Sequence, residues 1–160
     1  MAFKPTKIYA AALALMLAAT AVAAPIDEAK RLYREGDYAA AVEKLRTLVR
    51  RSPRDGNVNY YLGASLYAMG DNAEAVAPLK VAAGRGVADA HRMLAEIALA
   101  DYRADDASES LDAWSAALKK ARKSVPDSHA ELSSRALTMR NMLERVESIE
   151  AVSYTHLTLP

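Results

Sequence analysis

The sequence predicts an all-α fold, and two observations support that prediction. Ala, Leu, Glu, Lys and Arg, which are strong helix formers, dominate the 160 residues, while β-branched and aromatic residues are sparse. A stretch of sequence also recurs after 34 residues, a period typical of repeated helix pairs. The apolar spacing predicts helices near 26–35, 38–51, 57–69, 72–84, 88–103, 106–123 and 128–149.

The repeat is clearest between residues 33–42 and residues 67–76. Tyr, Gly, Asp, two Ala and Val recur there at a spacing of 34. Ala41 and Ala75 are small enough for the two helices of each pair to cross closely there. Pro53 is expected to stop the second helix of the first pair.

The turn inside each pair has a recognisable chemistry. Gly36 and Gly70 are predicted to end the first helices, where a residue with positive φ is needed. Asp37 and Asp71 follow and are predicted to cap the second helices with their carboxylates. Asp71 and Glu74 have the spacing of a capping box.

A third pair is less regular. Its first helix is predicted to run to Tyr102, which falls 35 residues after Tyr67, so this helix is expected to be about a turn longer than its counterpart. The segment 106–109 repeats the capping pattern. Ser128 and Glu131 then predict a capping box before a last helix, which either caps the array or begins a further unit.

The second unit resembles the tetratricopeptide repeat at Leu62-Gly63, Tyr67, Gly70-Asp71, Glu74-Ala75-Val76 and Leu79. It departs from that family at Asn59, where a large aromatic is preferred. Gly84-Arg85-Gly86 stands where the closing Pro is expected and is similar to Sel1-type units. The resemblance implies a right-handed superhelical solenoid of about three helix pairs plus a C-terminal helix.

Residues 1–23 are predicted to be a secretory signal with a basic start, an apolar run over residues 8–19 and small residues up to Ala23. We expect cleavage after Ala23, because a later cut would put Pro25 beside the scissile bond. An uncleaved anchor is the alternative, but the apolar run is shorter than the roughly 20 residues of a spanning helix. The signal predicts export, to the periplasm, with membrane contact only through the signal itself.

Residues 152–160 are predicted to be foreign to the natural protein, because an uncharged stretch follows a charged helical pattern abruptly. Its codons can be written GTC TCT TAT ACA CAT CTG ACG CTG CCG, which resembles the adaptor of transposase-based sequencing libraries. A native edge strand is the alternative. We therefore expect a repeat domain over residues 24–151 and a natural protein that continues beyond about residue 151.

Charge and composition argue against several classes of partner. Removal of residues 1–23 takes away Lys4 and Lys7 and leaves 19 Lys and Arg against 20 Asp and Glu. Such a balance does not favour nucleic-acid binding, which needs a clustered basic surface. The chain has no Cys, so an exported domain of this sequence depends on its apolar core alone.

No pattern indicates catalysis, a cofactor or a metal. His91 and His129 lie on different predicted helices, without the spacing of zinc ligands. Asp101, Asp105 and Asp106 surround a helix end, where they either attract a cation or cap and solvate the helix.

One basic run has two interpretations. Lys119, Lys120, Arg122 and Lys123 follow one another at the end of a predicted helix. They complement the helix dipole there, or they contact a polyanion or anionic lipid.

The resemblance implies a concave groove, lined by the first helix of each pair, that holds an extended peptide or a partner helix. The positions carried over are Lys30, Tyr33, Asn57, Tyr60, Ala64, Tyr67, Leu99 and Tyr102. Tyr33, Tyr67 and Tyr102 have the alternative of packing between helices.

These expectations describe a protein–protein interaction scaffold of the cell envelope. We expect a monomer with a protein or peptide partner. The alternative is the N-terminal structural repeat region of a larger envelope protein, with a β-propeller or peptidoglycan-binding domain downstream.

Overall fold

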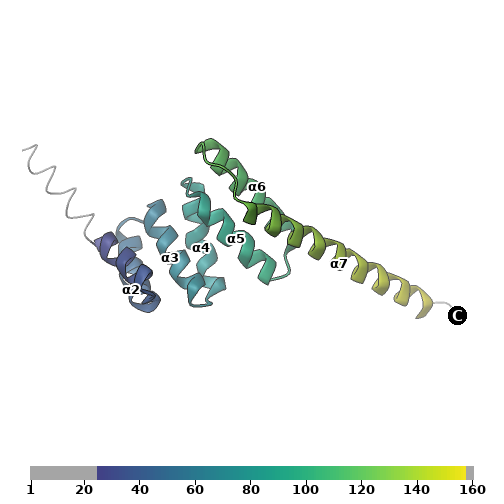
Figure 1. Cartoon of the computed structure of the whole chain (residues 1–160). Coiled ribbons are helices and arrows are strands. Elements are labelled where there is room, and N and C mark those ends of the chain that lie inside the picture. The colour runs from purple at the N-terminus through teal and green to yellow at the C-terminus, as the bar shows by residue number, and fades with distance from the viewer. Residues whose placement is uncertain (1–24, 158–160) are drawn as a thin grey trace, which may run out of the picture.

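The all-α prediction is confirmed by the computed structural model, which describes residues 25–157 and the side chains as far as residue 150. In this part the chain forms seven helices and no strand (Figure 1). They are a first helix at 25–35, α2 (Tyr38–Arg51), α3 (Gly56–Ala68), α4 (Asn72–Gly84), α5 (Ala88–Ala100), α6 (Ala104–Lys120) and α7 (Asp127–Leu157). The predicted signal at 1–23 lies outside the described residues.

The helices pack in sequential pairs, which is consistent with a helical repeat (Figure 1). We call 25–35, α3, α5 and α7 the first helices, and α2, α4 and α6 the second helices. In the described chain, helix 25–35 contacts α3 through Tyr33 and Tyr61, and the backbone of α5 lies close to those of α3 and α7. The backbones of the second helices do not approach one another as closely, although a side-chain ion pair links α2 to α4. The first helices therefore form one continuous layer.

Three pairs share one internal register. Each has a buried small residue in its first helix and another in its second helix, twelve positions later: Ala29 and Ala41, Gly63 and Ala75, Ala95 and Ala107. A fully buried leucine follows one helical turn after each second member: Leu45, Leu79 and Leu111. The common register places the second unit 34 residues after the first and the third unit 32 residues after the second.

Gly63 shows why these positions are small. A Cβ atom built on Gly63 would lie 2.6 Å from Leu79 Cγ and 3.2 Å from the carbonyl oxygen of Ala75. The backbones of α3 and α4 thus approach within a distance that only glycine allows. The predicted close crossing at Ala75 is confirmed by this contact.

The turns within the pairs also share a geometry. Gly36 and Gly70 have φ of 83° and 86°, so their prediction as helix-ending residues is confirmed. Tyr102 holds the same position in the third pair, with φ of 58°. The expected longer first helix is therefore wrong: α5 ends at Ala100 and has 13 residues, as α3 does. Tyr102 corresponds to Gly70 and not to Tyr67.

The capping predictions have mixed outcomes in the first two pairs. Asp37 accepts a hydrogen bond from the backbone N–H of Ala40 at 3.1 Å, as predicted. Asp71 holds the equivalent position but accepts no capping bond with its side chain. Glu74 instead pairs with Arg46 of α2, with 2.6 Å between Nη2 and Oε2. The predicted capping box is wrong because a neighbouring helix supplies a stronger partner for Glu74.

The later caps differ from prediction because the helices begin earlier. The residue before α6 is Arg103, so the segment 106–109 lies inside the helix. Helix α7 begins at Asp127, so Ser128 and Glu131 are also helical positions. The capping boxes predicted at these two places are wrong.

The apolar side chains of helix α7 are buried near its start and exposed further along. Leu132 and Ala136 are buried against the preceding helices, whereas Met142, Val146 and Ile149 are 60%, 53% and 67% exposed. No described residue covers this apolar stripe. The helix also continues past its predicted end, although a helical backbone does not bear on the origin of residues 152–160. None of the described helices is long and apolar enough to span a membrane.

We predict that Gly63→Ala destabilises the fold by about 1–3 kcal/mol, since the added methyl group must displace Leu79 or the α4 backbone. Urea unfolding measures this change. Gly84→Ala is the control, because a Cβ there meets no atom within 4 Å, and it should leave the free energy of unfolding unchanged or raise it by less than about 1 kcal/mol. Equal effects of the two substitutions would contradict the close crossing.

Candidate functional site

A cluster of aromatic rings lies on the face of the first helices and includes Tyr38, the first residue of α2. We define the tyrosine cluster as Tyr33, Tyr38, Tyr60 and Tyr61. The ring centroid of Tyr33 lies 5.6 Å from those of Tyr38 and Tyr61, and Tyr60 and Tyr61 are 5.3 Å apart. All four side chains are half-buried, so each ring packs on a neighbour and also faces solvent.

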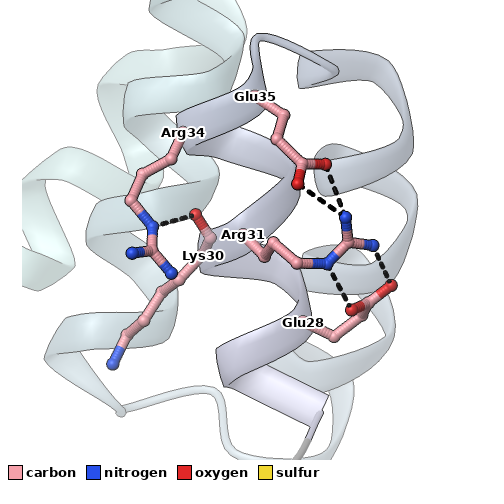
Figure 2. A network of polar contacts seen from close by, with 5 residues as sticks. All are labelled: Glu28, Lys30, Arg31, Arg34 and Glu35. Carbon is pink, nitrogen blue, oxygen red and sulfur yellow. Dashed lines mark hydrogen bonds and ion pairs between the residues drawn. The ribbon is translucent and has the colours of Figure 1, made fainter.

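Two cations of the first helix border this cluster. Lys30 Nζ lies 5.6 Å from the ring centroid of Tyr61, within the range of a cation–π contact. Figure 2 shows Lys30 and Arg34 on one side of the helix and Arg31 on another, where it bridges Glu28 and Glu35. The hydrogen bond from Arg31 lowers the pKa of Glu28. Arg31 is thus engaged by two carboxylates. Lys30 lies beside the cluster and also pairs with Asp27 at 3.7 Å, and Arg34 lies on the same side of the helix as Lys30.

A polar bridge links α3 to α5 on the same face. The hydroxyl of Tyr67 donates to Glu96 Oε2 at 3.0 Å, and Arg92 Nη1 donates to Glu96 Oε1 at 2.6 Å. Burial lowers the pKa of Arg92, but its charge interaction and hydrogen bond with Glu96 outweigh burial and raise it. Glu96 therefore holds one residue from each of two first helices.

Three tyrosine hydroxyls on this face, those of Tyr33, Tyr60 and Tyr67, have raised pKa values. Burial, followed by the charge of Asp89, raises the pKa of Tyr60 to about 12. Burial also raises the pKa of Tyr33, and burial followed by Glu96 raises that of Tyr67. The face therefore offers apolar rings with uncharged hydroxyl groups, bordered by Lys30 and Arg34.

The predicted groove residues fall into separate groups. Lys30, Tyr33, Tyr60 and Tyr67 lie on this face and are half-buried. Asn57 is exposed in the first turn of α3, where its backbone N–H donates to the cap residue.

The other predicted positions lie elsewhere. Ala64 and Leu99 are buried in the core. Tyr102 is 72% exposed but lies in the turn after α5, beside Met139 and Leu143 of α7.

Sequence reasoning missed Arg92 and Glu96. In the 32-residue register of the third unit, Tyr60 corresponds to Arg92 and Ala64 corresponds to Glu96. An alignment that matches Tyr102 to Tyr67 shifts the third unit by three residues relative to this register. In that shifted alignment Arg92 and Glu96 do not fall at groove positions. The buried small residues Ala95 and Ala107 were the signal that gives the right register.

The carboxylates of Asp101, Asp105 and Asp106, near the start of α6, lie next to arginine side chains. Arg103 pairs with Asp101 at 3.1 Å and with Asp106 at 2.6 Å. Arg140 Nε lies 2.9 Å from Asp105 Oδ1, although its N–H does not point at that oxygen. Among the side chains that the structure describes, residues 25–150, no three His, Cys, Asp or Glu are grouped to hold a metal ion.

His91 and His129, the two histidines whose side chains the structure describes, have different surroundings. His129 Nε2 lies 3.0 Å from the carbonyl oxygen of Leu111, and its ring packs 5.6 Å from that of Trp114. His91 is half-buried on α5, and burial lowers its pKa. His91 lines a pocket between α4, α5 and α6 together with Asp106 and Glu109.

Comparison with known proteins gives no match, either among protein-family models or among curated proteins.

We predict that the tyrosine cluster makes stability fall at high pH. The pKa of Tyr60 is higher in the folded chain than the ordinary value of 10.0, so its contribution is complete below pH 10 and is lost as pH rises through about 12. Urea unfolding between pH 8 and pH 12 should show a shallower decline for Tyr60→Phe than for the wild type. Tyr102→Phe, which removes an exposed hydroxyl outside the cluster, should keep the wild-type profile; the opposite ranking would refute the assignment.

Proposed function

We propose that this chain is a tetratricopeptide-like interaction module that binds a segment of a partner protein along the face of its first helices. The observation that carries the proposal is the surface formed by the tyrosine cluster, Lys30, Arg34 and the Tyr67–Glu96–Arg92 bridge. The proposed module binds and does not catalyse. Export to the periplasm is part of the proposal and rests on the sequence of residues 1–23.

The packing of the helices supports a concave binding face. The backbones of the first helices lie closer to one another than those of the second helices, between which Arg46 of α2 and Glu74 of α4 form an ion pair. An array whose helices lie closer together on one side than on the other is curved, and the side with the closer helices is the concave side. The tyrosine cluster then lies on the inner side of the bend, where a peptide or helix touches several units at once.

The chemistry of the face also suits protein binding. Tyrosine is enriched in protein interfaces because a large ring with few rotors carries a hydroxyl that tolerates water. The rings here already pack on each other, so little side-chain entropy remains to be lost on binding. Lys30 and Arg34 add charge at the border, where it sets specificity and association rate.

A second candidate is a structural role within a larger envelope protein. The exposed stripe of Met142, Val146 and Ile149 favours it, because a helix of this kind is stable when another element covers its apolar side. Reading the gene beyond the codon for Ala151 tests the idea: an open frame encoding a further helix or domain supports it, and a native stop codon opposes it.

We predict that a photo-cross-linking residue at Tyr60 captures a protein of the cell envelope. Thr47 and Lys80, exposed on second helices, are the matched control positions. The same cross-linking residue is placed at Tyr33, and the expected result, read by mass spectrometry, is one adduct of the same mass from Tyr60 and Tyr33 and none from the controls. Adducts of equal yield from both groups would overturn the proposed face.

A further inference from the structure

The basic run at the end of α6 belongs to a larger cationic surface. The chain passes from a second helix to the next first helix three times, over residues 50–56, 85–89 and 119–127. The first two passages carry Arg50, Arg51, Arg54 and Arg85, and the third carries Lys119, Lys120, Arg122 and Lys123. All eight side chains are exposed, and none is in an ion pair with another described residue. We call this surface the basic edge.

The three passages adjoin one another in space. A Cβ atom on Gly56 would lie 2.7 Å from Arg85 Cβ and 3.4 Å from Val87, so the first two passages touch. Helices α5 and α6 pack against each other after a turn of three residues, so the start of α5 lies at the same end of this pair as the end of α6, where the third passage begins. The eight cations therefore share one edge of the array.

Few carboxylates oppose them there. The same three passages hold only Asp55, Asp89 and Asp127, and Asp55 is engaged as the cap of α3. At the N-terminus of the first helix, Asp27 and Glu28 pair with Lys30 and Arg31 of that helix. The basic edge thus has an excess of uncompensated positive charge.

The opposite edge has the reverse balance. The turns over residues 34–38, 69–74 and 101–109 carry eight Asp and Glu against Arg34 and Arg103. Arg31, Arg46 and Arg140 pair with three of these carboxylates from outside the turns, so eight carboxylates less five arginines leave an acidic excess of three charges at this edge. Helices of 13 residues separate the two edges by about 20 Å, at about 1.5 Å per residue. That distance is about twice the screening length at 0.1 M salt, so each edge acts separately on an approaching charge.

The preference of cations for the C-terminal ends of helices explains the position of some basic-edge residues but not of all. Arg50 and Arg51, and Lys119 and Lys120, lie in the last turns of their helices. Arg54, Arg122 and Lys123 lie beyond the helix ends, where the dipole effect has faded. The excess is therefore a property of the surface.

We propose that the basic edge binds an anionic lipid bilayer, through the phosphate groups of several lipids at once. The cations stand on three separate passages, so no single small anion reaches them all, whereas a membrane surface does. A bilayer contacts the chain from one side only and so avoids the acidic edge. A long nucleic acid that wrapped the array would meet that acidic edge, and the three basic passages carry no aromatic ring for base stacking.

Vesicle co-sedimentation of the full chain tests the proposal. Phosphatidylcholine vesicles with 30% phosphatidylglycerol should bind the chain in 0.1 M salt and release it in 0.5 M salt, whereas pure phosphatidylcholine vesicles should bind it at least tenfold more weakly. Residues 1–24 are the same in every sample and variant, so any apolar binding by them adds equally to all. Equal binding to the two kinds of vesicle would overturn the proposal.

Charge-matched variants locate the binding surface. Replacing Lys119, Lys120, Arg122 and Lys123 together by Gln should weaken binding to the anionic vesicles at least tenfold, since each cation near such a surface contributes about 1 kcal/mol. The control replaces four exposed cations elsewhere by Gln: Lys44, Lys80, Arg135 and Arg145. It removes the same charge and should change binding by less than about twofold.

Two further outcomes would reject the basic edge as a membrane-binding surface. One is an equal loss of binding in the control variant, which would mean that net charge alone matters. The other is displacement of the chain from anionic vesicles by duplex DNA at matched phosphate concentration, which would assign the edge to nucleic acid. Circular dichroism of each variant confirms that the helices are intact.

Discussion

The close approach of two helices at a pair of small residues is the constraint on which this fold depends. Gly63 leaves no space for a side chain against Leu79 and the Ala75 carbonyl, and Ala29 and Ala95 stand at the equivalent positions of the other pairs. Close-packed interiors do not tolerate an added methylene at such a contact. The crossing point then sets where the buried leucine, the left-handed turn residue and the start of the second helix fall, so each pair repeats one geometry.

The same constraint arranges the candidate binding face. Because the first helices contact one another in register, residues at equivalent positions become neighbours across the face. Tyr60 of α3 therefore corresponds to Arg92 of α5, and Ala64 corresponds to Glu96. The bond from Tyr67 to Glu96 is one product of this arrangement, and the raised pKa of Tyr60, caused by burial and then by Asp89, is another. A surface that depends on several units in this way is well suited to a long ligand and poorly suited to a small one.

Sequence reasoning found the helices and the first two pairs, because Gly36 and Gly70 mark the turns directly. It misplaced the third pair, since Tyr102 adopts the left-handed conformation that a glycine normally signals, and a tyrosine was matched to a tyrosine. The capping interactions were harder to predict from sequence. Glu74 forms an ion pair with Arg46 on another helix, and no local sequence pattern indicates such a partner. The basic edge was seen only as the run 119–123, because its other cations lie far away in sequence and meet it through packing.

The basic edge and the tyrosine face can be occupied at the same time, because they lie on different sides of the helical array. Helix ends form the edges, while helix sides form the face, so a bilayer against the edge leaves the rings of Tyr33 and Tyr60 open to solvent. The charge also accumulates with repetition, since each passage from a second helix to a first helix adds cations at the same edge. A chain whose basic and acidic residues nearly balance has little net attraction to an anionic surface. Because the basic and acidic residues lie at opposite edges, the chain has a preferred orientation on an anionic surface, with the basic edge toward the lipid. In this orientation the tyrosine face is perpendicular to the membrane and open to a partner approaching along its plane.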